Sequence, residues 1–374
     1  MEFRIAKDEL IRALSRVQGI VEKRSTNPII ANVLLEVSPQ GMRVAATDTE
    51  VAFVGRYAVE CSRAGALTLG ARQLYEIARL VPTDAVTFTL PEGSSQMEIR
   101  SGKAFFKVLG LSADEFPPVP DPPEGSDAIE IEASDLKALI DKTLYAISSD
   151  DTRTGLNGAH VEPRKEGGKT SLRFVATDGH RLSLCGRPYT GTVDFPSSLL
   201  LPKKGLAELR KLVEDGEGTW RMSFAENQAV FCKGSTSFSM RLLEGDFPDY
   251  TQVIPKAWQR RIEVPRDALV AALRRVSILA AEKSHPVRLA VESGTVVVTA
   301  RQPETGEARE ELEAQVEGTD LEIGFNARYF RDALVALNTD RVVVEIGDSL
   351  SPCLVRPADE AADELYVIMP MRLE

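Results

Sequence analysis

Asp178 and His180 are the residues of this chain whose types and spacing best suit acid–base chemistry. They stand in the segment VATDGHRL, residues 175–182, with Gly179 between them. Residues two apart in a strand point to the same side, so a carboxylate there can orient an imidazole, as in a hydrolase triad. A triad also needs a nucleophile, and the chain has no G-x-S-x-G segment. We therefore interpret Gly179 as a turn or a close backbone approach, and keep a hydrolase using Asp178 and His180 as the alternative.

Phosphate-loop and metal chemistry are disfavoured by spacing. The segment GGKTS at 167–171 resembles a phosphate-binding loop, but the full motif needs glycine at position 163, where the chain has Pro163. His160, His180 and His285 are scattered without an H-x-x-x-H pair, and the four cysteines form no C-x-x-C. The sequence predicts no metal, no disulfide framework and no cofactor.

The composition is that of a soluble globular protein. The chain has 374 residues, of which 43% are hydrophobic and 27% charged, which suits two or three domains. The N-terminal segment MEFRIAKDEL carries charges where a signal peptide needs an apolar run, and no stretch is long and apolar enough to span a membrane. We expect a cytoplasmic protein with no membrane partner. The net charge of -11 taken alone argues against nucleic acid.

The chain repeats itself three times. The first shared block is FRIAKDELIRALSRVQGIV from Phe3, IEIEASDLKALIDKTLYAI from Ile129 and IEVPRDALVAALRRVSILA from Ile262. Each copy predicts a strand followed by an amphipathic helix. A second helical block follows from Leu69, Leu201 and Phe325, and RVAATDTEVAF from Arg43 echoes RFVATDGHRLSL from Arg173. Alternating runs between the helices predict antiparallel strands, so the fold class is α+β with three repeated domains, each with two helices on antiparallel sheet.

Linker composition and charge distribution refine this organisation. Pro-rich and polar segments near 115–127 and 253–261 predict domains at 1–126, 127–258 and 259–374, here named repeats 1, 2 and 3. The predicted helices span 7–24, 72–80, 134–148, 203–214, 265–281 and 327–338. They hold eighteen Lys and Arg against ten Asp and Glu, on an otherwise strongly acidic chain. If the basic helices share one side of the molecule, they form a positively charged stripe on which DNA can lie. The alternative is that Lys and Arg occur there because they are good helix formers on solvated faces.

Several motifs together resemble one family. They are LNG at 156–158, VATDGHRLSLC at 175–185, PKKG at 202–205, FPDY at 247–250, EIGFNARY at 322–329 and YVIMPMRL at 366–373. In order and over essentially the whole chain they resemble the bacterial DNA polymerase III beta subunits, the sliding clamps. The resemblance implies a non-catalytic processivity factor of the replicative polymerase. It also implies a head-to-tail homodimer that forms a closed ring, with helices lining a hole around double-stranded DNA and no dependence on base sequence.

The resemblance also implies three sets of site residues. The residues that would face DNA are Arg24, Arg72, Arg153, Lys203 and Lys204. A hydrophobic pocket would bind peptides of the replicative polymerase, the clamp loader and other proteins with a clamp-binding motif. Its residues would be Leu156, Thr177, Gly179, His180, Arg181, Leu182, Pro248, Val253, Val367, Met369, Pro370, Met371 and Arg372. The dimer contact would comprise Lys103, Phe106, Val108, Ile278, Leu279, Glu304 and Glu307.

The chain departs from the family's familiar member at a few positions. Thr154 and Gly155 stand where two tyrosines are expected, and Asp150 adds a negative charge to the same loop. Base stacking by that loop is therefore in doubt. Gln252 replaces an arginine, and Glu374 extends the C-terminus. We expect these two changes to alter the peptide preference.

Overall fold

The structure is a computed structural model. It describes residues 1–21, 27–119, 127–166, 168–196, 199–214, 216–225, 227–280, 285–303, 306–359 and 363–372. Contacts divide the chain into two compact units. Unit 1 comprises Met1–Ser134, Thr190–Asp194 and Lys204–Leu242, and unit 2 comprises Asp135–Tyr189, Phe195–Lys203 and Leu243–Glu374. Both units draw residues from repeat 2.

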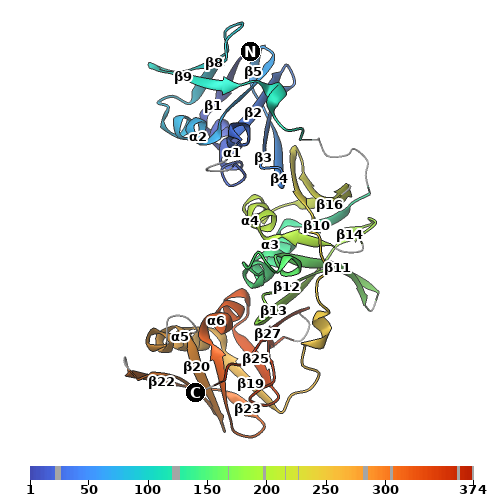
Figure 1. The fold of residues 1–374 in the computed structure, drawn as a ribbon, viewed down its shortest axis with the longest axis vertical. Helices are drawn as coiled ribbons and strands as arrows, with labels where there is room; N and C mark the ends of the chain where they lie inside the picture. Colours follow the sequence, from blue (N-terminus) through green and yellow to red (C-terminus); the bar gives the residue numbers. More distant parts are fainter. Residues whose placement is uncertain are drawn as a thin grey trace. The chain divides into compact units, whose positions relative to one another are not determined.

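All six predicted helices are present in the part of the chain that the structure describes. They are α1 (Lys7–Ser15), α2 (Ala71–Leu80), α3 (Ala133–Thr143), α4 (Lys203–Leu212), α5 (Arg266–Val276) and α6 (Ala327–Ala336). In unit 1, α1 contacts α2 (Figure 1). Leu10 and Leu14 of α1 and Leu74 of α2 are buried. In unit 2, α5 and α6 contact each other in the same way. None of these helices is long and apolar enough to cross a membrane.

The first helix of each repeat ends earlier than its apolar periodicity predicts. α3 passes into a 3-10 turn at Leu144–Ala146, and α5 passes into one at Ser277–Leu279. The hydroxyl of Thr143 donates to the carbonyl of Leu139 at 2.6 Å, and that of Ser15 donates to Arg12 at 3.0 Å. Such local bonds compete with continued helix.

Each repeat contains the same two groups of antiparallel strands. In repeat 1 the first group is β1 (Glu2–Ala6), β7 (Ala85–Thr89), β8 (Gln96–Ser101) and β9 (Ala104–Leu111). The second group is β2 (Asn32–Ser38), β3 (Gly41–Thr47), β4 (Val51–Tyr57) and β6 (Gly65–Gly70). The other two repeats follow in the same order, first group and then second. In repeat 2 they are β10 (Ile129–Glu132), β16 (Thr219–Ala225), β17 (Gln228–Lys233), β18 (Thr236–Arg241) and β11 (Gly158–Glu166), β12 (Lys169–Thr177), β13 (Arg181–Pro188), β15 (Leu200–Pro202). In repeat 3 they are β19 (Arg260–Pro265), β25 (Arg341–Ile346), β26 (Cys353–Pro357), β27 (Glu364–Ile368) and β20 (Pro286–Glu292), β21 (Thr295–Gln302), β22 (Gly306–Glu313), β24 (Leu321–Asn326). A short strand flanks the first strand of each repeat: β5 (Glu60–Arg63), β14 (Thr190–Gly191) and β23 (Gln315–Glu317).

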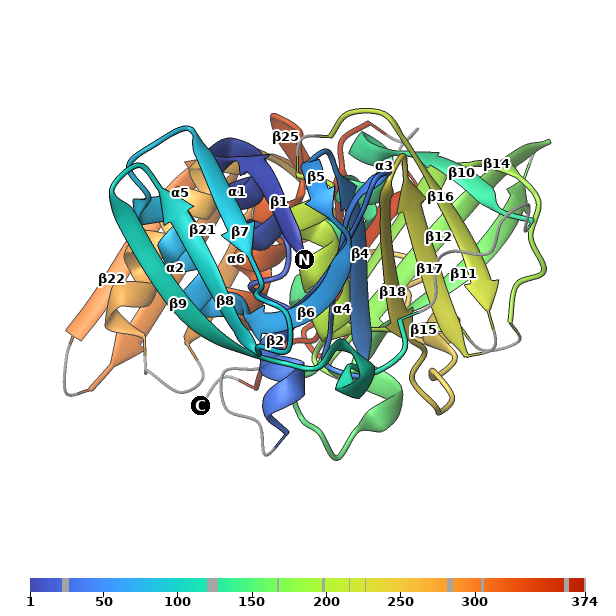
Figure 2. The same ribbon diagram turned by 90° about the horizontal axis from the view of Figure 1, so that it is seen from above.

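Successive repeats are joined by strand pairing inside each unit. In unit 1, β4 of repeat 1 pairs with β18 of repeat 2, with Val51 opposite Met240; we name this pairing joint 1 (Figure 2). In unit 2, β13 of repeat 2 pairs with β27 of repeat 3, with Arg181 opposite Ile368; this is joint 2. Both joints are continuous antiparallel ladders, so main-chain hydrogen bonds hold the repeats together.

Candidate functional site

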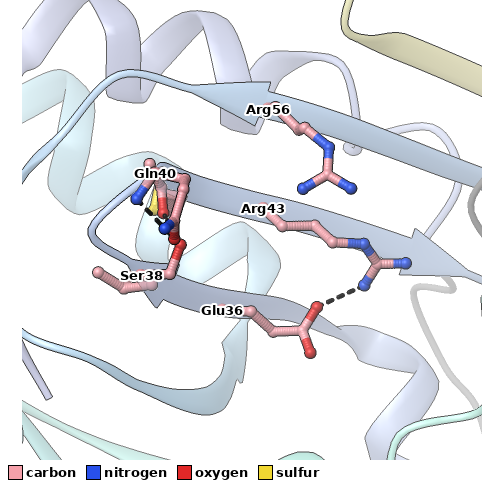
Figure 3. Close-up of a pocket in the computed structure, with 8 residues that line it drawn as sticks. Glu36, Ser38, Gln40, Arg43 and Arg56 are labelled. Atoms are coloured by element: carbon pink, nitrogen blue, oxygen red, sulfur yellow. Dashed lines mark hydrogen bonds and ion pairs between the residues drawn. The ribbon is translucent and has the colours of Figure 1, made fainter.

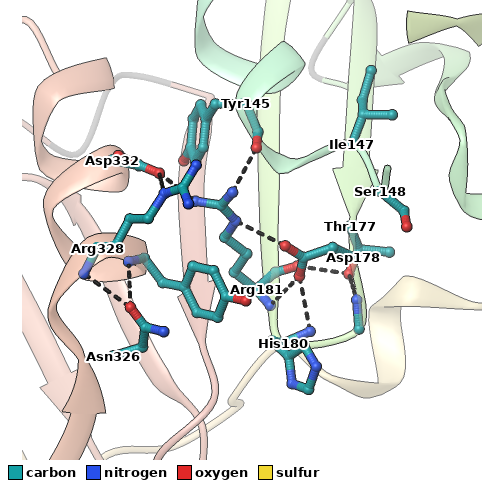
Figure 4. A network of polar contacts seen from close by, with 12 residues as sticks. Tyr145, Ile147, Ser148, Thr177, Asp178, His180, Arg181, Asn326, Arg328 and Asp332 are labelled. Atoms are coloured by element: carbon teal, nitrogen blue, oxygen red, sulfur yellow. Dashed lines mark hydrogen bonds and ion pairs between the residues drawn. The ribbon is translucent and has the colours of Figure 1, made fainter. Parts of the chain in front are cut away.

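The turn between β12 and β13 is closed by its own side chains. Thr177 Oγ1 donates to the carbonyl of Arg181 at 2.6 Å. Asp178 Oδ1 accepts the backbone N–H groups of His180 at 3.0 Å and Arg181 at 3.1 Å (Figure 4). Gly179 has a φ of +88°, a left-handed conformation that glycine adopts without steric cost. The Asp178 carboxylate therefore holds the turn, which confirms the interpretation of Gly179.

His180 does not form an acid–base pair with Asp178. Its ring stacks on Tyr329 of α6, with centroids 6.1 Å apart and planes 14° from parallel. Among the described residues no three His, Cys, Asp or Glu side chains gather as metal ligands. The geometry that the alternative hydrolase requires is thus not formed at this motif.

The same turn recurs at joint 1, in the segment that the sequence echo identifies. Thr47 Oγ1 donates to the carbonyl of Val51 at 2.9 Å, and Asp48 Oδ1 accepts the N–H groups of Glu50 at 2.9 Å and Val51 at 2.8 Å. Thr49 takes the left-handed conformation, with a φ of +78°. The threonine–aspartate turn is therefore a structural element of the repeat.

Each turn also receives the last strand of the following repeat. At joint 1 the N–H of Arg241 donates to the carbonyl of Glu50 at 2.8 Å. At joint 2 the N–H of Met369 donates to the carbonyl of His180 at 2.9 Å. The two joints share this bond, but at joint 2 the residue after the ladder is an exposed methionine and at joint 1 it is an arginine.

Arg181 braces the turn of joint 2. Its guanidinium donates to Asp178 Oδ2 at 3.0 Å, to Asp332 Oδ2 on α6 at 2.7 Å and to the carbonyl of Tyr145 at 2.7 Å. It lies over the rings of Tyr145 and Tyr329, 5.0 and 4.6 Å from their centroids. Only 9% of the residue is exposed. A cation this buried is held by paired carboxylates and aromatic faces, and burial raises the pKa of Tyr145 beneath it.

Unit 2 brings most of the expected pocket residues together. Leu182 lies opposite Val367 in the joint 2 ladder, and both belong to one buried cluster with Tyr250. Phe247 packs against this cluster, next in sequence to Pro248. Met369, two residues after Val367 and directly after the end of β27, is 37% exposed.

The remaining pocket residues flank this surface. Val253 is 40% exposed and follows Tyr250, whose carbonyl accepts its N–H at 3.2 Å. The N–H of Met371 donates to the carbonyl of Gly324 at 2.8 Å, which anchors the segment containing Pro370. Arg372 is exposed.

The loop containing Leu156 explains one departure from the family pattern. A Cβ at Gly155 would lie 2.5 Å from the carbonyl oxygen of Asp246, so this loop conformation has no room for a side chain. Gly155, the neighbour of Leu156 in sequence, therefore lies against Asp246, two residues before Pro248. Gln252, the second departure, donates through Nε2 to Asp249 Oδ2 at 3.0 Å.

The expected DNA-facing residues have different surroundings. Arg24 lies outside the described residues, and Arg72 is exposed on α2. Arg153 is exposed, donates to the carbonyl of Asp178 at 3.2 Å and is 3.5 Å from a carboxylate oxygen of Asp150. The negative charge expected from Asp150 therefore lies beside the cation.

The two lysines of α4 each contact protein groups. Lys203 Nζ donates to the carbonyl of Ile147 at 2.9 Å and to Ser149 Oγ at 2.7 Å, and burial lowers the pKa of Lys203. Lys204 forms an ion pair with Oδ2 of the buried Asp48. Lys204 thus pairs with the turn aspartate of joint 1, as Arg181 pairs with the equivalent aspartate, Asp178, at joint 2. The sequence does not reveal this correspondence.

The expected dimer residues lie on edge strands and a helix end. Lys103 is exposed in the turn before β9, whereas Val108 is only 3% exposed and faces the core. Sequence reasoning missed Phe105 and Leu109, which alternate with Val108 and are 43% and 66% exposed. The pleat of β9 therefore presents them outward.

The repeat 3 side of the expected dimer contact has an exposed apolar side chain beside β22, which is rich in glutamate. Ile278 is 76% exposed, Leu279 is half-buried and Glu307 on β22 is exposed. Glu304 lies outside the described residues.

A hollow of about 170 Å³ lies on repeat 1, away from the expected site residues (Figure 3). Its lining includes Glu36, Arg43 and Arg56, which occupy neighbouring strands. Arg43 donates to Glu36 at 2.5 Å and to the carbonyl of Val119 at 2.5 Å. The guanidinium of Arg43 in this hollow therefore already has hydrogen-bond acceptors within the protein.

Three α+β domains, each with two helices on antiparallel sheets, define a protein built from repeated clamp domains. Family models of the DNA polymerase III beta subunit match nearly the whole chain: the N-terminal domain at residues 1–120, the central domain at 130–249 and the C-terminal domain at 251–372. The chain belongs to this family, the bacterial beta sliding clamps. It is a processivity factor of DNA polymerase III and not an enzyme.

Relatives and solved structures agree along the full length. The beta sliding clamp of Pseudomonas putida is 36% identical over 374 residues, and that of Escherichia coli K12 is 35% identical over 375 residues, with 100% of each chain covered. A crystal structure of the DNA polymerase III subunit beta from Pseudomonas aeruginosa matches with a TM-score of 0.92 at 35% identity and full coverage of both chains. The sliding clamp from Caulobacter crescentus matches with a TM-score of 0.90 at 34% identity, also over both full chains. The resemblance stated from the motifs is confirmed.

Proposed function

We propose that two copies of this chain close head to tail into a ring around double-stranded DNA. The observation that carries this proposal is a pair of strand edges left over after the repeats have joined. By their place in the repeat, β4, β13 and β22 are equivalent strands, and so are β18, β27 and β9. Joint 1 uses β4 with β18 and joint 2 uses β13 with β27. β22 ends its sheet, and β9 beyond its contact with β6 pairs only with β8 among the described strands.

We infer the register of the proposed contact between copies from the registers of the two internal joints. Ala52 lies opposite Ser239 at joint 1, and Leu182 lies opposite Val367 at joint 2. Following the strand ladders through each repeat, the equivalent pair is Glu307 of one copy and Lys107 of the other. The same antiparallel register places Glu311 opposite Lys103. Both pairs bring opposite charges together, which stabilises a cross-strand contact.

Exposed apolar side chains support the same contact. Leu109 and Phe105 project from β9, and Ile278 follows α5 beside β22. A contact between two different surfaces of the same chain either closes into a ring or runs on as a filament. With two copies of three repeats each, closure pairs each strand of the set β4, β13 and β22 with one of the set β18, β27 and β9.

The proposed ring holds DNA by enclosing it, and its contacts with the phosphates are weak. Arg24, Arg72, Arg153, Lys203 and Lys204 supply positive charge, and such contacts carry no base preference. Lys204 contributes less than an unpaired lysine, because Asp48 neutralises part of its charge. Weak, sequence-independent contacts allow the ring to slide. A chromosome-bound processivity factor works in the cytoplasm of a bacterium, and we place the protein there.

We assign the surface around joint 2 to partner peptides. Met369 and Val253 offer exposed apolar contacts above the buried Leu182 and Val367. A flexible methionine adapts to different side chains, which suits a site shared by the replicative polymerase, the clamp loader and other proteins with a clamp-binding motif. Arg181 is held inside the protein, so its role is to position the turn beneath the peptide.

Truncating the two exposed apolar residues tests the peptide assignment. In a Met369→Ala, Val253→Ala double variant, we expect affinity for a synthetic clamp-binding-motif peptide to fall at least about tenfold, since both contacts lie over a desolvated floor. Fluorescence anisotropy measures the loss. The matched control is Leu350→Ala, which removes another exposed apolar side chain. Equal peptide affinity for the double variant and wild type would refute the pocket.

The ring itself is tested by topology. A closed ring stays on nicked circular DNA and leaves when the circle is cut, whereas a protein bound by contacts alone is retained equally on both.

A further inference from the structure

Each repeat ends its first helix with a cation at the same position. The aligned segments place Arg16, Lys142 and Arg275 there. At joint 2, Lys142 forms a buried ion pair with Glu364 on β27. Arg275 donates to Glu310 at 3.0 Å. In repeats 2 and 3 this cation therefore meets a carboxylate.

Joint 1 has a hydroxyl at the corresponding place. Thr236 lies opposite Gly55 in the joint 1 ladder, as Glu364 lies opposite Cys185 at joint 2. Arg16 donates to Thr236 Oγ1 at 3.2 Å. No carboxylate among the described residues pairs with Arg16, although its repeat equivalents each have one.

A hollow of about 90 Å³ lies beside this hydroxyl. Arg16, Lys233, Thr236 and Trp220 line it together with Leu212. Lys233 brings a second positive charge from the end of β17; its ammonium group donates one hydrogen bond to the carbonyl of Glu217 and has three N–H donors in all. A water molecule takes up about 30 Å³ in the liquid, so the hollow has room for one tetrahedral oxyanion.

A buried donor that lines this hollow lacks a hydrogen-bond partner among the described residues. It is Nε1 of Trp220, a residue that is only 1% exposed. The hydroxyl of the buried Tyr57 lies beside Arg16; burial raises the pKa of Tyr57, and a hydrogen bond with Arg16 lowers it. A buried donor without a partner is costly, so the hollow favours a ligand that offers acceptors.

We propose that this hollow binds a free inorganic phosphate ion, whose oxygens take the place at joint 1 that the Glu364 carboxylate has at joint 2. Arg16, Lys233 and Thr236 supply the donors. The ion contacts α1 of repeat 1 and β17 and β18 of repeat 2, so its binding stabilises joint 1. Charge-assisted hydrogen bonds of this kind are the strong ones in proteins.

Titration of the full-length protein with sodium phosphate tests the site, with sodium chloride at matched ionic strength as the salt control. We expect saturable calorimetric binding, and slower hydrogen exchange of the β18 amides in phosphate. Arg16→Gln weakens binding at least about tenfold, because a charged hydrogen bond is lost. Thr236→Glu abolishes binding by placing a carboxylate beside Arg16, and slows β18 exchange without phosphate.

The matched control is Arg79→Gln, which removes an exposed arginine of α2 paired with Glu76 and leaves phosphate binding unchanged. Undiminished binding in both Arg16→Gln and Thr236→Glu would overturn the proposal, and so would an equal response to chloride. A short DNA duplex at the same phosphate concentration separates the sources of the anion. A response to the duplex but none to free phosphate would also overturn the proposal.

Discussion

Replacing Arg181 by alanine is expected to destabilise joint 2 by about 3–5 kcal/mol, because it leaves two carboxylates without their buried cation. Asp178 and Asp332 both lie within hydrogen-bond distance of the guanidinium, which the rings of Tyr145 and Tyr329 enclose. Hydrogen exchange of the amides of β13 and β27 measures the loss. Protection there falls more than about a hundredfold, since each tenfold corresponds to roughly 1.4 kcal/mol.

Arg328 provides the matched control for this variant. It approaches the same Asp332 at 4.0 Å, but its side chain is 64% exposed. Arg328→Ala is expected to change protection by less than about 1 kcal/mol, the ordinary range of exposed pairs. Equal effects of the two alanine variants would show that Arg181 is not the brace of joint 2.

Reversing the charge of β9 is expected to separate the proposed dimer. In the proposed register Lys103 lies opposite Glu311 and Lys107 opposite Glu307, so Lys103→Glu with Lys107→Glu brings like charges together on both pairs. Such juxtaposition costs several kcal/mol at an interface. Analytical ultracentrifugation should then show a species near 40.9 kDa in place of one of twice that mass.

The compensating change tests the register itself. Glu307→Lys with Glu311→Lys, added to the reversed β9, restores opposite charges and is expected to restore the dimer. Lys107 Nζ also lies 3.2 Å from a carboxylate oxygen of Glu98 on β8. In the rescued protein this pair consists of two glutamates, so the rescue does not restore it. Two results would contradict the register. One is a β9 variant that remains dimeric, and the other is a four-substitution variant that remains monomeric while both variants are folded.

Local patterns predict the repeat architecture well. The helical stripe containing Leu10 and Leu14 and the alternation in the strands are consequences of side-chain periodicity, which the sequence displays directly. The threonine–aspartate turn also has local causes, because Asp side chains bond to backbone groups two and three residues onward. Its structural role at Asp178 follows from this chemistry.

Long-range pairings are not visible in the sequence. The ion pair of Lys204 with Asp48 joins residues of different repeats, so no spacing rule identifies it. The outward faces of Phe105 and Leu109 depend on the register of β9 against β8, and that register is set by the whole sheet. The early ends of α1 and α3 coincide with side-chain bonds of Ser15 and Thr143 to the backbone, and such local bonds compete with continued helix.

Retention on closed DNA tests enclosure most directly. Protein loaded onto nicked circular DNA by a clamp loader is separated from free protein by gel filtration at a salt concentration that screens phosphate contacts. We expect the protein to remain with the circle and to be released when one restriction cut linearises it. Equal retention on circular and linear DNA, or release from both, would contradict the ring.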